Sequence, residues 1–232
     1  MFVGHFGVAF AAKRATPRTN LAILVLACEL VDVIWPILVL LGVERVTIRA
    51  GITPVTPLAF DYYPWTHSLL MTVFWGVVLG CVCYTIKKDK RAAVVLALVV
   101  ASHWVLDYIS HIPDLPAAPW SQAKFGLGLW NSRLWTAVVE LAIFFGGVTL
   151  YLRSTKARDR IGRFALLAYV VFLTFIYLLN IQGAPPPSVR VMATSAEIGT
   201  VILFLWAWWI DHHREAIAPQ IVQKPFSTPI HN

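Results

Sequence analysis

The sequence contains six apolar stretches, each long enough to cross the hydrocarbon core of a bilayer as a helix. Only 13% of the 232 residues are charged, against about 25% in a soluble domain, and the mean hydropathy is +0.69. Because a chain in lipid must satisfy its backbone hydrogen bonds internally, we expect an all-α, polytopic transmembrane bundle of about six spans. The predicted spans are Asn20–Val43, His67–Ile86, Ala92–His111, Leu134–Leu152, Phe164–Ile181 and Val191–Ile210.

The segment Phe2–Ala12 is also apolar, but it is too short to cross a bilayer. We expect a half-helix that either enters the bundle or lies at its surface. The sequence shows no internal repeat, so residues 1–218 are predicted to form a single bundle domain. Residues 219–232 are predicted to be a flexible cytoplasmic tail.

The formal net charge of +7 could suggest binding to nucleic acid, but the basic residues lie in short loops between apolar spans. In that position they indicate topology instead. If the segment before the first span is cytoplasmic, 14 of the 19 Lys and Arg residues fall on the cytoplasmic side and 5 on the other. This bias predicts a protein integral to the cytoplasmic membrane, with both termini in the cytoplasm and no nucleic-acid partner.

The two longest connections, Glu44–Thr66 and Ile112–Arg133, are both predicted on the outer side, and each contains three prolines. Loops of this length in a compact bundle are often lids or binding loops. An ordered cap without chemistry explains the length equally well, so both interpretations stay open.

Ionisable side chains within the spans are the main functional signal. A charge in hydrocarbon is costly, so ionisable residues within spans are rare and usually functional. Counting about 1.5 Å per residue from the cytoplasmic ends of the helices places them between mid-bilayer and the outer surface. They come from different segments, so one cavity that opens outward could hold them. The residues are His5, Glu29, Asp32, His67, His103, Asp107, His111 and Glu140.

The strongest local motif places His103, Asp107 and His111 four residues apart, on one face of a helix. Imidazole and carboxylate both suit Zn, Mn or Fe, so the motif predicts a divalent metal site, with zinc as the first choice. A structural network of hydrogen bonds is the alternative. Glu29 and Asp32 also share a helix face, and two carboxylates this deep need a cation or protons.

A second motif places Thr66 and His67 at the start of a span. Thr66 is predicted to be the N-cap and His67 to open the helix, where the N-terminus favours an anion or a metal-bound hydroxide. An ordinary capped helix start is the alternative. We assign no role to His212, His213 or His231, which follow the last span.

The order of these signals resembles the membrane-bound metal-dependent hydrolase family, of the LexA-regulated inner-membrane hydrolase type. The resemblance covers about Met1–His111. It rests on Gly4-His5, the acids on the next helix, Thr66-His67-Ser68, and His103 with Asp107 four residues later. It implies a hydrolase whose metal ligands are His5, Asp32, His67, His103 and Asp107. The chain departs from the family pattern at Tyr63-Pro64-Trp65, where members carry His-Arg-Gly, so it lacks an arginine suited to phosphate.

The leading hypothesis is a membrane-embedded hydrolase with one or two divalent ions, acting on an ester or phosphoester of a lipid or lipid-linked substrate at the outer leaflet. His111 would be a further ligand, and Glu140 or Glu29 would be the general base. The alternative is a proton- or metal-ion-coupled transporter in which the same residues form a relay. A third hypothesis is a non-catalytic membrane assembly protein with a vestigial site.

Overall fold

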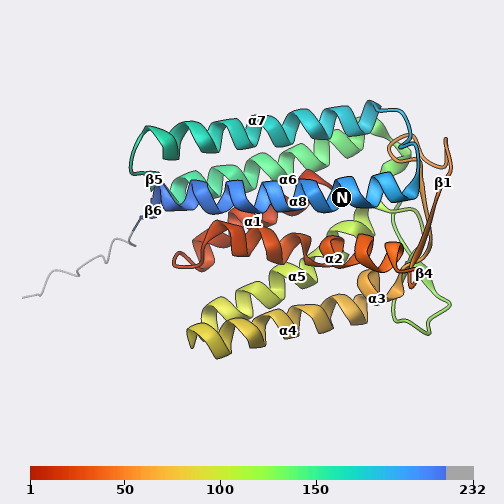
Figure 1. Ribbon diagram of the computed structural model, residues 1–232, viewed down its shortest axis with the longest axis horizontal. Coiled ribbons are helices and arrows are strands. Elements are labelled where there is room, and N and C mark those ends of the chain that lie inside the picture. Colours follow the sequence, from red (N-terminus) through yellow and green to blue (C-terminus); the bar gives the residue numbers. More distant parts are fainter. Residues whose placement is uncertain (218–232) are drawn as a thin grey trace, which may run out of the picture.

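The computed structural model describes residues 1–217, which form a helical bundle with a shorter helix at its centre (Figure 1). Six helices in this part of the chain are long and apolar enough to span a membrane. They are α2 (Leu21–Leu40), α4 (Leu69–Lys87), α5 (Lys90–Ser110), α6 (Arg133–Ser154), α7 (Arg160–Gln182) and α8 (Val189–His212). The predicted polytopic all-α bundle is confirmed. The predicted tail, residues 219–232, lies outside the described residues.

The short apolar segment at the start of the chain forms α1 (Val3–Ala15), which enters the bundle instead of lying on its surface. Nine of its 13 residues are buried. It packs against α2, α5, α6 and α7, and Figure 1 places its amino end near the middle of the bundle. His5, in the first turn of α1, therefore lies in the interior of the protein.

Polar side chains cap the long helices, because the first backbone amides of a helix have no partner within it. The capping side chains are Asn20 for α2, Ser68 for α4, Asp89 for α5, Ser132 for α6, Asp159 for α7 and Ser188 for α8. The start of each span is therefore specified locally.

The start of α4 differs from the sequence prediction. Ser68 is the N-cap, with its Oγ accepting a hydrogen bond from the Met71 amide at 3.2 Å. Thr66 and His67 belong to a separate single turn, α3 (Pro64–His67). The prediction that Thr66 caps the span and His67 opens it is therefore wrong. The reason is that the Thr66 hydroxyl is bonded elsewhere, to Glu44.

The two long connections are folded into small antiparallel sheets. β1 (Arg45–Ile48) pairs with β2 (Leu58–Tyr62), and β3 (Leu115–Pro116) pairs with β4 (Lys124–Phe125). With the single turn η1 (Leu129–Asn131), they lie at one end of the bundle (Figure 1). They cover an apolar cluster that contains Trp35, Tyr63 and Leu115. This end of the bundle is thus an ordered cap.

The opposite end is closed by a third small sheet, in which β5 (Thr155–Ala157) pairs with β6 (Arg214–Ala216) (Figure 1). Lys13, at the end of α1, is buried there, and its Nζ lies 2.8 Å from Oδ1 of Asp211 on α8. Between the two ends, large apolar side chains such as Leu98 and Phe164 face outward. Such a surface is suited to contact with lipid.

Candidate metal centre

The side chains of the five expected ligands meet inside the bundle in two groups that share His103. In the first group, one ligand atom each from His5, His103 and Asp107 lies within 4.8 Å of the others. The second group, formed by Asp32, His67 and His103, meets the same limit. The structure thus brings together residues of α1, α2, α3 and α5.

Helix α5 provides the centre of the cluster. His103 and Asp107 are one turn apart, and Nε2 of His103 lies 3.1 Å from Oδ2 of Asp107. The ring of His5 stacks on that of His103, with centroids 3.7 Å apart and planes 4° apart. Nε2 of His5 lies 3.1 Å from Oδ1 of Asp107. Two stacked imidazoles therefore face the two oxygens of one carboxylate.

The His103 ring is oriented by the backbone of α2. Its Nδ1–H donates to the Cys28 carbonyl oxygen at 2.8 Å, and a carbonyl only accepts, so the neutral ring carries its lone pair on Nε2. This Nε2 is buried and has no hydrogen-bond partner among residues 1–217. It nevertheless lies 3.6 Å from Oδ2 of Asp32, as well as close to Asp107. A lone pair facing two carboxylates is unfavourable unless a proton or a metal ion lies between them.

His67 is oriented by an acid that sequence reasoning missed. The Thr66 hydroxyl donates to Oε2 of Glu44 at 2.7 Å, and its Oγ1 lies 2.8 Å from Nδ1 of His67. Because the hydroxyl proton is given to the carboxylate, the oxygen accepts from Nδ1–H of His67. Nε2 is left 3.0 Å from Oδ1 of Asp32. Burial raises the pKa of the Glu44 carboxyl, and the hydrogen bonds from Thr66 oppose the rise.

His111, the C-cap residue directly after α5, has the same arrangement. Its Nδ1 lies 2.9 Å from Oδ1 of Asp114, which also accepts from the Tyr63 hydroxyl at 2.7 Å. Its Nε2 lies 3.8 Å from Oδ2 of Asp107. Hydrogen bonding of one ring nitrogen to an acceptor, with the other turned towards the site, is typical of metal-binding histidines. The residues present therefore fit a divalent ion.

The two acids expected to act as general base differ in their surroundings. Oε2 of Glu140 accepts from the backbone amides of Phe2 at 2.7 Å and Gly4 at 3.2 Å, so it holds the start of α1. Oε1 of Glu29 lies 3.4 Å from Sγ of Cys28. No backbone amide of the described chain donates to Glu29, so its carboxylate has more capacity to accept a proton.

The Met1 nitrogen lies beside the same cluster. It contacts Oδ1 of Asp107 and lies 3.1 Å from Oγ of Ser110. An ion held by Asp107 would have to use the other carboxylate oxygen or displace this contact. Oδ2 is the oxygen that faces His67, His103 and His111.

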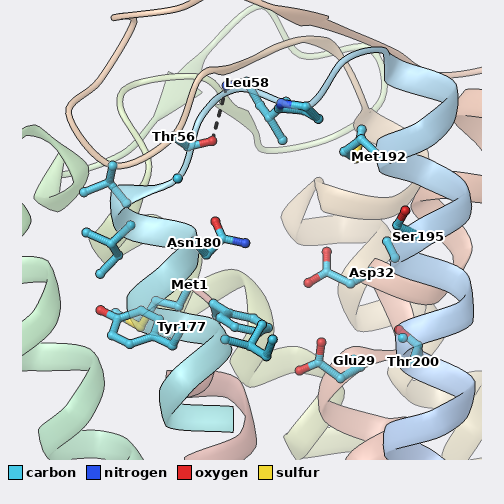
Figure 2. Close-up of a pocket in the computed structure, with 18 of the residues that line it drawn as sticks. Met1, Glu29, Asp32, Thr56, Leu58, Tyr177, Asn180, Met192, Ser195 and Thr200 are labelled. Carbon is cyan, nitrogen blue, oxygen red and sulfur yellow. Dashed lines mark hydrogen bonds between the residues drawn. The ribbon is translucent and has the colours of Figure 1, made fainter. Parts of the chain in front are cut away.

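A cavity of about 740 Å³ reaches the cluster from the side of α7 and α8. This volume is within the usual range of small-molecule sites, about 300–1,000 Å³. Asp32 connects the cavity to the cluster, because its side chain is 35% exposed whereas those of His103 and Asp107 are 1% and 3% exposed. Figure 2 shows Asp32 and Glu29 pointing into the space between the two helices. A molecule in the cavity would meet Asp32 as the most exposed side chain of the cluster, and His67, Asp107 and His111 also line the cavity.

The fold and the cluster together define a polytopic membrane protein with an intramembrane group of histidines and carboxylates open to a cavity. The chain belongs to the YdjM inner membrane protein family, whose family model matches residues 2–183. The match covers every residue of the cluster and supports an integral location in the inner membrane. No curated protein and no solved structure matches the chain.

Proposed function

We propose that this protein is a metal-dependent hydrolase that holds one or two divalent ions, with zinc as the first choice and manganese or iron as alternatives. The ligands would be His5, Asp32, His67, His103 and Asp107, with His111 as a further ligand. One observation supports this proposal above all. The Nε2 atoms of three histidines converge on Asp32 and Asp107 while their Nδ1 atoms are hydrogen-bonded to acceptors.

When bound, a divalent ion would polarise an ester or phosphoester and lower the pKa of a bound water. Asp32, the most exposed of the proposed ligands, would face the substrate. Glu29 lies one turn before Asp32 and also lines the cavity, so it is our first choice for the base that takes a proton from the attacking water. Glu140 is the second choice, because it already binds the amides of α1.

The proposed substrate is a lipid or lipid-linked ester or phosphoester in the outer leaflet. The cavity lies among spanning helices, and most of its lining side chains are apolar. The cluster is near the end of the bundle that carries the cap, because the rings of His111 and His67 lie 5.0 and 5.2 Å from those of Phe60 and Tyr63. The bias of basic residues towards the opposite end supports an outer location for this cap, with both termini in the cytoplasm.

The interior beyond the cluster supports a hydrolase over an ion transporter, because a transporter needs a polar path to the other end. Between His5 and Lys13 on α1, the described centre of the bundle is filled by aromatic rings. Phe10 packs edge to face against Phe144 and Tyr169, with centroid distances of 6.1 and 6.2 Å. All three of these side chains are fully buried.

Hydrolysis is tested with metal-loaded protein in mixed micelles that contain phospholipid, a chromogenic ester or a chromogenic phosphodiester. We expect turnover that a chelator abolishes. Glu29→Gln should lower kcat about 100-fold and leave the metal bound, because it removes a proton acceptor but no ligand. Glu197→Gln, which changes an acid of α8 outside the cavity lining, should have no effect. Fully metal-loaded protein that cleaves none of these esters would contradict the proposal.

The hydrogen-bonded pair Glu44 and Thr66 provides a second test, directed at the metal itself. Glu44→Gln should weaken zinc binding about tenfold, because an outer carboxylate makes the histidine ligand more basic and fixes its ring. The measurement is competition with a fluorescent zinc chelator. Glu215→Gln, an exposed acid at the opposite end, is the matched control and should bind zinc like the wild type. Equal zinc affinity in both variants would show that Glu44 has only a structural role.

A further inference from the structure

The cavity has the form of a groove between α7 and α8. One wall comes from α7, which contributes Phe172, Ile176 and Leu179, and the other comes from α8, with Val191, Ile202 and Leu203. From Val191 to Leu203 the helix rises about 18 Å, at about 1.5 Å per residue. The groove is therefore long, and most of the side chains along its two walls are apolar.

The groove is open towards the membrane. Leu179, Val191 and Ile202 line it and are also 51%, 45% and 53% exposed, on helices that face lipid. Side chains that belong to both a cavity and the outer surface mark its mouth. A molecule in the bilayer could therefore enter sideways, between α7 and α8, without passing through the cap.

Polar groups are concentrated on one part of the groove. Figure 2 shows Asp32 at the level of Ser195 on α8, Glu29 near Thr200, and Asn180 on the facing side of α7. Beyond Thr200, the lining residues Ile202 and Leu203 are apolar. The groove thus offers polar contacts near the cluster and apolar contacts deeper in the membrane, which is the order of groups in a lipid of the outer leaflet.

The chemistry of the groove limits what can occupy it. A lipid has an ester or phosphoester to place at the polar part, beside Asp32, and a hydrocarbon chain to place against the apolar side chains. The cavity volume of about 740 Å³ is within the range of small-molecule sites. Gly199 adds space, since a Cβ atom placed there would meet no atom within 4 Å.

We propose that one acyl chain of a membrane lipid lies in the groove between α7 and α8, with its ester or phosphoester beside Asp32. This inference rests on the proposed hydrolase function for the fate of the ester, but the binding of the chain does not require catalysis. The lipid enters from the bilayer with its chain directed towards Ile176 and Leu203. Gly199 leaves the path open beside Glu29.

The test uses nanodiscs of phosphatidylethanolamine and phosphatidylglycerol with a trace of phosphatidylglycerol whose palmitoyl chain ends in a diazirine. After irradiation, labelled residues are identified by mass spectrometry. We expect labelling of Ile176 and Leu203, which face the groove. Gly199→Phe should reduce it about tenfold by filling the space of the chain, with Gly199→Leu intermediate. Val77 on α4, a lipid-facing residue, should be labelled equally in every variant.

Gly146→Phe is the matched control, because Gly146 on α6 also has no atom within 4 Å of an added Cβ but lies outside the cavity lining. It should leave the labelling of Ile176 and Leu203 unchanged. The groove proposal would be overturned if Ile176 and Leu203 were not labelled in the wild type. It would also be overturned if Gly199→Phe left their labelling unchanged. Metal is measured on the same samples. Labelled but metal-free wild-type protein would refute the metallohydrolase and leave the groove standing, so the two failures are distinguishable.

Discussion

Replacing His103 with alanine should release the metal from the purified protein, with less than about a tenth of the wild-type content remaining. The expected loss is large because His103 belongs to both groups of ligand-type side chains. Its removal also leaves His67 as the one remaining imidazole of the described chain within 4 Å of both Asp32 and Asp107. The measurement is elemental analysis of protein purified in mild detergent, with zinc, manganese and iron quantified per chain.

His212→Ala is the control for this experiment. His212 ends α8 near the opposite end of the bundle, where its Nδ1 donates to the Trp208 carbonyl oxygen at 2.8 Å. It should keep the wild-type metal content. Wild-type protein that is metal-free after gentle purification, and stays so when zinc or manganese is supplied, would refute the metal proposal. In that case a hydrogen-bonded network with a protonated imidazole would explain the cluster, and His103→Ala would change stability alone.

Gly147→Leu should prevent α1 from packing in the bundle. The backbones of α1 and α6 are in direct contact at Gly7 and Gly147, and a Cβ atom at Gly7 would lie 2.6 Å from the Ile143 carbonyl oxygen. A side chain at Gly147 would overlap the backbone of Gly7. Because neither backbone can give way cheaply, we expect a loss of about 3 kcal/mol or more and a fall in Tm of roughly 10 °C. Thermal unfolding in detergent, followed by tryptophan fluorescence, measures it.

Gly146→Leu provides a control from the adjacent residue on the same helix. Gly146 is exposed, and an added Cβ would meet no atom within 4 Å. The Tm of the Gly146→Leu variant should therefore stay close to that of the wild type. Since α1 carries His5 and is held at its start by Glu140, Gly147→Leu should also weaken metal retention. Equal Tm values for the two leucine variants would show that the close approach of α1 and α6 is not required.

The sequence was sufficient to predict the helices, since a span is specified by its own length and apolarity. The stretch expected at Asn20–Val43 forms α2 at Leu21–Leu40, with Asn20 as its cap. The helix ends three residues before the predicted Val43, because the chain turns at Gly42, where φ is +75°. The error at Thr66 has a different origin. Both Thr66 and Ser68 can cap a helix, and the choice between them depends on Glu44, 22 residues earlier.

The grouping of His5, Asp32, His67, His103 and Asp107 also followed from the sequence, because depth in a bilayer can be counted along each helix. The roles of these residues remain a proposal. Depth counting could not find Glu44 or Asp114, since both lie in loops outside the spans. Nor could it find the Cys28 carbonyl, which holds His103 from another helix. A search for acids close to the ends of the spans would have included Glu44.

The sequence by itself determined that this chain is a membrane bundle, which segments cross the bilayer, and which ionisable residues lie at a common depth. These properties depend on the transfer of each segment into lipid, which is local and additive along a helix. Only the tertiary structure decided that α1 enters the core, which imidazole nitrogen faces the carboxylates, and that a groove opens between α7 and α8. These features depend on the rotation and spacing of neighbouring helices, which are set by backbone contacts such as Gly7 with Gly147 and by hydrogen bonds between distant residues.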